Sequence, residues 1–169
     1  MDTTLYERLM NAGFRFVSYR PRSEREIKEF LQKTLKRWKT AGRLTVDKVM
    51  DRLKDYGHVD DLKFSLWWID QRGTFRPKGK LAITMELYKK GIAKQVIEEA
   101  FAARSNKEGE GVFDEVAGAR KVIQKKLVKI GQLPINEQKM KVYTFLTQRG
   151  FSRETVDKII DESIKKDYN

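Results

Sequence analysis

SEREIKEFLQKTLKRW, residues 23–38, carries the clearest helical pattern in this sequence. Its charged residues fall between apolar residues that recur every three or four positions, which is the spacing of one face of an α-helix. Ser23 and Glu26 stand in the arrangement of a capping box, in which each residue bonds the backbone N–H of the other and marks a helix start. The apolar stripe consists of Ile27, Phe30, Leu31, Leu35 and Trp38.

The same periodicity continues along the chain, and glycines separate most of the periodic segments. The first 20 residues contain Gly13 between apolar residues, so we expect one irregular helix there. An all-α fold follows. The further helices are predicted at about 45–55, 60–72, 80–90, 93–103, 114–130, 136–149 and 152–166.

One short pattern occurs twice: Leu-x-x-basic-Gly-apolar, at Leu87–Ile92 and at Leu146–Phe151, each time followed by an amphipathic segment. This echo predicts tandem three-helix repeats. Units this small bury little apolar area alone, so they should stack into an elongated molecule. The expected division is an N-terminal segment 1–20, repeats at 21–76 and 77–131 with a flexible Gly-rich joint at 104–111, and a partial repeat at 132–169.

The composition excludes several classes of protein. The 169 residues include 36 Lys and Arg, 24 Asp and Glu, one His and no Cys, for a net charge of +12. Disulfide scaffolds, Cys-ligated metal centres and thiol nucleophiles are therefore ruled out. No segment has the ~20 apolar residues of a membrane span, and the N-terminus lacks a signal-peptide pattern, so we expect a cytoplasmic protein with a polyanionic partner.

Two long tracts contain basic residues and no acid. On the second tract, Lys121, Lys125 and Lys129 are four residues apart and share a helix face. Lone charge runs are usually solvated helix faces, but two such tracts in so basic a chain predict an electrostatic binding surface. The tracts are Gln71–Met85 with Arg72, Arg76, Lys78 and Lys80, and Val116–Asn136 with Arg120, Lys121, Lys125, Lys126 and Lys129.

The adjacent carboxylates Asp60 and Asp61 could form a metal or acid–base site. A helix N-cap with a second acid favourable to the helix dipole is the better interpretation, because no third ligand accompanies them. We therefore expect no catalytic residue, no metal and no cofactor.

Four segments resemble the RecX family, the bacterial regulators of RecA recombinase, and they occur in the family's order between Arg20 and Ile164. His58 replaces the family's usual aromatic residue and Ser65 its usual alanine. The segments are Arg20-Pro21-Arg22-Ser23-x-x-Glu26, Gly57-His58-Val59-Asp60-Asp61-x-x-Phe64, Lys80-Leu81…Glu86-Leu87-x-x-Lys90-Gly91-Ile92 and Arg149-Gly150-Phe151-Ser152.

The resemblance implies a curved, elongated stack of three-helix repeats without catalytic activity. It also implies binding along the groove of the RecA–single-stranded DNA filament, with inhibition of filament growth, ATP hydrolysis, strand exchange and co-protease activity. Single-stranded DNA, and in some members duplex DNA, are further implied ligands, and we expect a monomer. For Arg20 and Arg22, local pairing with nearby carboxylates is an equally strong alternative to partner contact.

The residues expected to contact the partner are Arg20, Arg22, Arg72, Arg76, Lys78, Lys80, Lys90, Arg120, Lys121, Lys125 and Lys129. Those expected to shape the family's fold are Ser23, Glu26, Gly57, Asp60, Asp61, Phe64, Trp68, Leu87, Gly91, Gly150 and Phe151.

Two other functions are compatible with the charge. A DNA-binding transcription regulator could use a helix-turn-helix within one repeat, although no helix is rich in base-reading Asn, Gln and Arg. A nuclease would need carboxylate clusters for metals or a nucleophile in a pocket, and the sequence shows neither.

Overall fold

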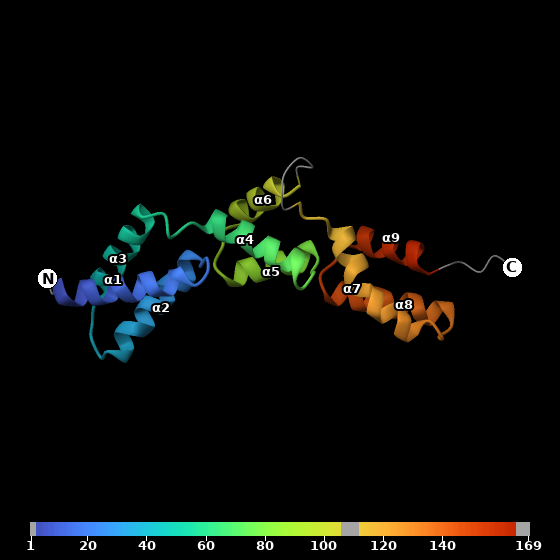
Figure 1. Ribbon diagram of the computed structural model, residues 1–169, viewed down its shortest axis with the longest axis horizontal. Helices are drawn as coiled ribbons and strands as arrows, with labels where there is room; N and C mark the ends of the chain where they lie inside the picture. The colour runs from blue at the N-terminus through green and yellow to red at the C-terminus, as the bar shows by residue number, and fades with distance from the viewer. Residues whose placement is uncertain (1–2, 106–111, 165–169) are drawn as a thin grey trace. The chain divides into compact units, whose positions relative to one another are not determined.

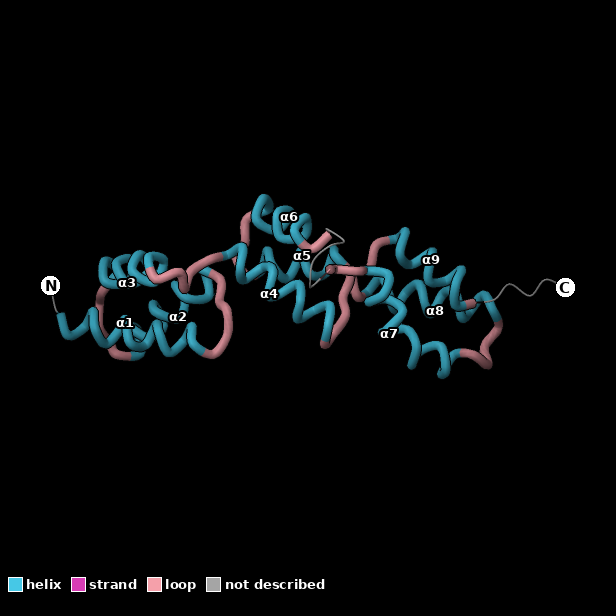
Figure 2. Tube along the Cα trace, turned by 45° about the horizontal axis from the view of Figure 1, so that its top comes forward, coloured by secondary structure: helices cyan, strands magenta, loops and turns pink. Residues whose placement is uncertain are grey.

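A computed structural model describes residues 3–105 and 112–164 of the chain, and these residues form nine α-helices and no strand (Figures 1 and 2). The all-α class is confirmed. The joint expected at 104–111 lies, apart from its first two residues, outside the described ones. The helices are α1 Thr3–Ser18, α2 Glu24–Arg37, α3 Arg43–Asp55, α4 Asp61–Thr74, α5 Lys80–Lys89, α6 Lys94–Ala103, α7 Glu115–Ile130, α8 Ile135–Gln148 and α9 Arg153–Ser163.

The helix boundaries follow from local capping. The Ser23 hydroxyl accepts a bond from Glu26 N (3.2 Å), and the Glu26 carboxylate accepts one from Ser23 N (3.3 Å), which completes the capping box of α2. Asp114 caps α7 in the same way, by accepting a bond from Ala117 N (2.9 Å). Each cap satisfies backbone N–H groups that the helix itself leaves unpaired.

The first helix differs from the expected irregular one, because α1 runs regularly through Gly13. A Cβ at Gly13 would lie 3.2 Å from Leu53 Cδ1 of α3. The missing side chain therefore lets α1 lie close against α3, and this packing outweighs the low helix propensity of glycine.

The N-terminal bundle consists of α1, α2 and α3, which pack on one another (blue to teal in Figure 1). The apolar stripe of α2 faces this core, as its spacing predicts. Phe16 and Phe30 stack at its edge with ring centroids 4.0 Å apart. The buried core residues are Leu9, Met10, Ile27, Leu31, Leu35, Val46, Val49, Met50 and Leu53.

The C-terminal bundle consists of α7, α8 and α9, which also pack on one another. These three-helix groups begin one helix earlier than the expected repeats 21–76, 77–131 and 132–169. The difference arises because α1 is a full member of the first bundle and not a separate leading segment. The buried core residues of the C-terminal bundle are Ala119, Ile123, Ile130, Val142, Leu146, Phe151, Val156, Ile159 and Ile164.

The chain divides into two compact units. The first consists of residues 1–67 and 88–100, and the second of residues 68–87 and 101–169. The N-terminal bundle belongs to the first unit and the C-terminal bundle to the second, while α4, α5 and α6 contribute to both.

Three helices end in a hydrogen-bonded turn with a left-handed glycine. After α3, Gly57 has φ 71° and its N–H bonds to Lys54 O at 2.8 Å. After α5, Gly91 has φ 84° and its N–H bonds to Tyr88 O at 2.9 Å. After α8, Gly150 has φ 75° and its N–H bonds to Thr147 O at 2.9 Å. Glycine is favoured at such positions because it has no Cβ to clash in the left-handed region.

We predict that Gly150→Ala destabilises the protein more than Gly57→Ala does. A Cβ at Gly57 meets nothing within 4 Å, so only the left-handed backbone is penalised, by about 1–2 kcal/mol. A Cβ at Gly150 overlaps Ala82, which adds about 1–3 kcal/mol of overpacking. Thermal unfolding followed by circular dichroism measures both variants, and equal losses would contradict the close approach at Ala82.

Candidate functional site

The first basic tract is held largely by Glu86 of α5. Its carboxylate accepts bonds from Trp68 Nε1 (2.8 Å) and Arg72 Nε (2.7 Å) and pairs with the Lys78 ammonium. Arg72 also lies over the Trp68 ring, 4.5 Å from its centroid. Trp68 is thus half-buried at a polar cluster. Two of the expected contact residues, Arg72 and Lys78, have a structural partner here.

The partners of Glu86 shift its pKa. Its side chain is only 21% exposed, and burial alone would raise the pKa of the carboxyl. The hydrogen bonds from Lys78, Arg72 and Trp68 outweigh burial and hold the pKa below its usual value. Glu86 therefore stays ionised and neutralises part of the tract.

Glu26 of α2 forms a second such cluster. Its carboxylate pairs with Arg20 (3.0 Å) and with Lys90 (2.7 Å), while the Ser23 hydroxyl donates to Lys90 O (2.8 Å). Burial opposes ionisation of Glu26, but the hydrogen bonds that its carboxylate accepts from Arg20, Lys90 and the Ser23 backbone N–H lower its pKa. Arg20 and Lys90 therefore join the start of α2 to the end of α5.

Arg22 has a local role of a different kind. Its Nε donates to Phe16 O at 3.3 Å, and its guanidinium lies 4.1 Å from the centroid of the Phe16 ring. Burial, together with the neighbouring Arg20 charge, lowers the pKa of Arg22. Local contacts therefore account for both arginines of the first family segment.

Glu115 of α7 forms a third cluster, which sequence reasoning missed. Its carboxylate accepts bonds from Lys80 N (2.7 Å), Ser152 Oγ (2.6 Å) and Thr155 Oγ1 (2.8 Å). The starts of α5, α7 and α9 therefore meet at one carboxylate. The Lys80 side chain itself is exposed, with its ammonium 5.2 Å from the centroid of the Phe101 ring. No local pattern in the sequence distinguishes Glu115 from other helix-start acids.

The second basic tract keeps more of its charge available. Arg120 makes two bonds of 2.9 Å to Glu162, and Lys121 Nζ donates to Thr74 O at 2.8 Å. Lys125 and Lys129 are exposed, and within residues 3–105 and 112–164 neither has a carboxylate in ion-pairing distance. The same holds for Arg76 of the first tract.

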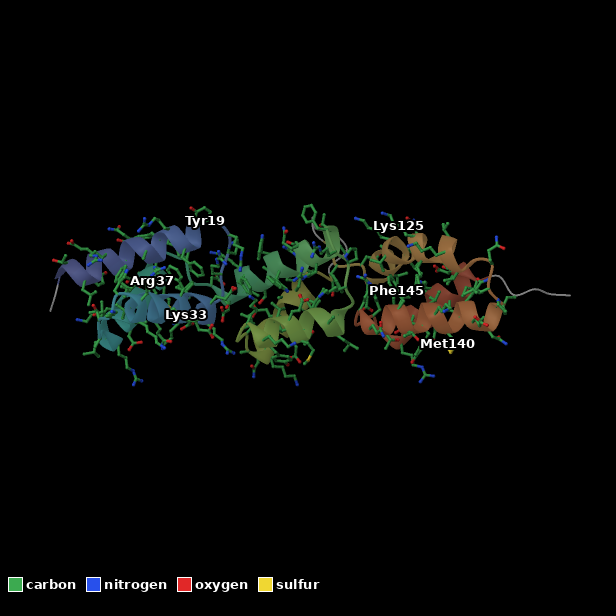
Figure 3. The ribbon with its side chains drawn as sticks, turned by 90° about the horizontal axis from the view of Figure 1, so that it is seen from below. Tyr19, Lys33, Arg37, Lys125, Met140 and Phe145 are labelled. Carbon is green, nitrogen blue, oxygen red and sulfur yellow. The ribbon has the colours of Figure 1, made fainter. Side chains whose placement is uncertain are left out.

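Aromatic and sulfur-containing side chains accompany these cations on α8, and sequence reasoning missed them too. Phe145 lies under Arg149 (4.6 Å) and Lys126 (5.7 Å). Figure 3 labels Phe145, Lys125 and Met140 in the C-terminal bundle. Met140 is 63% exposed. The signal was available, because residues 138–153 also contain basic residues and no acid.

The adjacent aspartates have separate structural roles. Asp60 accepts a bond from Lys63 N (2.9 Å) at the start of α4, and Asp61 accepts one from Glu24 N (2.8 Å) at the start of α2. Burial raises the pKa of Asp61. In the described part of the chain, no three His, Cys, Asp or Glu side chains are grouped to hold a metal ion. None of the described helices is long and apolar enough to cross a membrane.

Comparison with known proteins gives the family of this chain. The family model for the second three-helix domain of RecX matches residues 60–100, and that for the third three-helix domain matches residues 114–160. The regulatory protein RecX of Pelodictyon phaeoclathratiforme is 30% identical over 142 residues, which cover 84% of this chain and 80% of the relative. This chain belongs to the RecX family.

Other RecX proteins are similar over most of this chain. The regulatory protein RecX of a Geobacillus strain is 30% identical over 86% of the chain, and this chain spans 49% of that relative's length. The crystal structure of RecX from Lactobacillus salivarius has a TM-score of 0.77 at 19% identity and covers 94% of this chain and 96% of its own. The fold of tandem three-helix domains is therefore that of RecX.

We predict that Glu86→Gln lowers stability at pH 7 by about 1–3 kcal/mol, since two half-buried cations lose their carboxylate. The folded pKa of Glu86 lies below the unfolded value of about 4.3. The contribution of Glu86 to the free energy of unfolding is therefore fully present above the unfolded pKa and is lost as pH falls through the folded pKa. The variant should thus lose less unfolding free energy than the parent between about pH 5 and pH 3.

Urea unfolding at several pH values measures this difference. Glu137→Gln is a matched control, because Glu137 is exposed on α8 and has no ion pair within the described residues. Parallel stability curves for Glu86→Gln and the parent would show that the cluster does not depress the pKa of Glu86.

Proposed function

We propose that this protein is a non-catalytic regulator that binds the RecA–single-stranded DNA filament and inhibits filament growth, ATP hydrolysis, strand exchange and co-protease activity. Membership of the RecX family supports the proposal, and its relatives are named regulatory proteins. The protein acts as a monomer in the cytoplasm, where RecA filaments form. It also binds single-stranded DNA.

One observation assigns the proposal to particular residues. Some cations of the basic tracts pair with a carboxylate of the protein, whereas others have no carboxylate partner within the described residues. Arg20, Lys90, Arg72, Lys78 and Arg120 are paired with Glu26, Glu86 or Glu162. These side chains stabilise the fold, so their charge is partly neutralised before any partner arrives.

The contact surface on the second unit is instead formed by Arg76, Lys125 and Lys129, which are exposed. Lys80 and Lys121 extend it, since each is exposed and, among residues 3–105 and 112–164, contacts a ring or a carbonyl and no carboxylate. A filament presents the same protein and phosphate groups many times, so several weak contacts add through effective concentration. Binding is therefore salt-sensitive.

We predict that the triple variant Arg76→Glu, Lys125→Glu, Lys129→Glu inhibits RecA-driven ATP hydrolysis about tenfold more weakly, because reversed charges repel the filament. The assay titrates the protein into RecA on single-stranded DNA at roughly 50 and 200 mM salt. The matched control is Lys94→Glu, Arg153→Glu, Lys158→Glu, which reverses three exposed charges elsewhere on α6 and α9.

The two parts of the proposal have separate outcomes. Absence of inhibition by the parent protein would overturn the function, whereas equal inhibition by the two triple variants would overturn the residue assignment. Tight preference for one duplex sequence in a gel shift would favour the transcription regulator instead. Magnesium-dependent hydrolysis of DNA, lost in Asp60→Ala, would favour the nuclease.

A further inference from the structure

A further acid-free tract lies in the N-terminal bundle. Residues 30–46, from the last two turns of α2 to the first turn of α3, include no acid. All five of their cations are exposed, and within the described part of the chain none has a carboxylate in ion-pairing distance. These cations are Lys33, Lys36, Arg37, Lys39 and Arg43.

Three of the five line a groove. The groove has a volume of about 630 Å³ and lies between the end of α2 and the start of α3, with Lys36, Lys39 and Arg43 on its walls. The buried side chains Leu35 and Val46 form part of its base. The volume is in the range of sites that take small ligands. Lys33 and Arg37, which Figure 3 labels on α2, are not among its lining residues.

The helix start at this groove adds to its preference for anions, and the acid that lines the groove is paired. Asp47 also lines it, but it pairs with Lys28 at 3.5 Å, so it does not neutralise the three wall cations. Gly42 precedes α3 without a side-chain cap, so the positive end of the α3 dipole faces this region unshielded.

Lys39 gives an independent sign of function. It has φ 54°, and in the described residues it is the one non-glycine residue with positive φ. Its N–H bonds to Lys36 O (3.0 Å) and Thr40 N–H bonds to Leu35 O (3.1 Å), which is the same turn that Gly57 and Gly150 form after α3 and α8.

A lysine in this turn is therefore an exception within one chain. The left-handed conformation is unfavourable for any residue with a Cβ, and glycine would remove that penalty. No bond to the Lys39 ammonium within the described residues offsets it. The turn accounts for the left-handed backbone, because it satisfies carbonyl groups at the end of α2, but it does not call for a lysine, which is consistent with a use of this side chain in binding.

We propose that the α2–α3 groove binds the phosphodiester backbone of nucleic acid through Lys36, Lys39 and Arg43. The three cations contact phosphates, and contacts of this kind position a strand without reading its sequence. An acidic protein surface is the weaker candidate, because lysine is depleted in protein–protein interfaces, whereas it commonly binds phosphate. The inference deepens the proposed function by assigning to this groove a DNA contact within the filament.

Fluorescence anisotropy with a labelled single strand of random sequence tests the groove without RecA. We expect Lys36→Ala, Arg43→Ala to weaken binding about tenfold or more and to reduce the slope of log affinity against log salt by about 1.5, for two lost phosphate contacts. The matched control Lys33→Ala, Arg37→Ala loses the same charge from the same segment outside the groove and should weaken binding less than about threefold.

Three outcomes would overturn the proposal that the groove binds the phosphodiester backbone. Equal weakening by the two double variants would indicate diffuse attraction to the whole segment. Polyglutamate binding as tight as the strand, and lost in the same groove variant, would indicate an acidic protein partner. An unchanged salt slope would exclude phosphate contacts. A duplex of equal length, run in parallel, distinguishes the two sources of the backbone.

Single substitutions of Lys39 separate its binding role from its backbone role. Lys39→Gly should raise the melting temperature by a few degrees, because the left-handed penalty disappears, while it weakens strand binding severalfold. Lys39→Arg should retain binding. Unchanged affinity in Lys39→Gly, or a lower melting temperature, would overturn the argument from Lys39.

The ATP hydrolysis assay with RecA keeps the two proposals distinguishable. If the groove variants lose strand binding while the parent fails to inhibit RecA, the proposed function is wrong and nucleic-acid binding by the groove is supported. If the parent inhibits RecA and the groove variants bind strands normally, nucleic-acid binding by the groove is wrong and the proposed function is supported.

Discussion

Three half-buried glutamates organise this strongly basic chain. A carboxylate withdrawn from water is unfavourable unless charged or polar donors replace the water. Glu26, Glu86 and Glu115 each accept at least three such donors. Because those donors come from different helices and from the segments that flank them, the hydrogen bonds of each carboxylate also help to fix where helices begin, end and meet.

The geometry of the clusters shows what they connect. Glu26 links the start of α2 to the end of α5 through Lys90, and Glu86 links α4 to α5 through Trp68 and Arg72. Glu115 joins the starts of three helices. The three glutamates are not among the buried core residues of the two bundles, so their polar bonds add to the apolar packing of the helices that they connect.

The clusters also explain why charge in the sequence is an incomplete guide to binding. Arg72 and Arg76 stand in the same acid-free tract, yet Arg72 is bound to Glu86, whereas Arg76 is exposed and has no carboxylate partner within the described residues. The acid that distinguishes their environments lies just beyond the tract. An acid-free run therefore predicts a basic region, while tertiary contacts decide which of its cations remain available.

Local patterns predicted the local structure well. The spacing of apolar residues placed α2 to α9 within a few residues at nearly every end, because helix periodicity and caps are properties of neighbouring residues. The regular course of α1 through Gly13 was not predictable in this way, since it depends on Leu53, which lies forty residues further along and packs where a Cβ would be. Glu86 stood in a family segment, but the side chains that bind it, like those that bind Glu115, were not predictable for the same reason.

The basic tract at residues 30–46 is a different kind of omission. It was visible in the sequence, as were the tracts at 71–85 and 116–136, but it was not among the predicted binding regions. Only the backbone reveals that Lys39 has the left-handed conformation that Gly57 and Gly150 have elsewhere. In the carboxylate clusters, hydrogen bonds and ion pairs within the fold offset the cost of removing the ions from water. The strain at Lys39 has no such compensation within the described chain, so an external anion is the consistent explanation for a lysine at this turn.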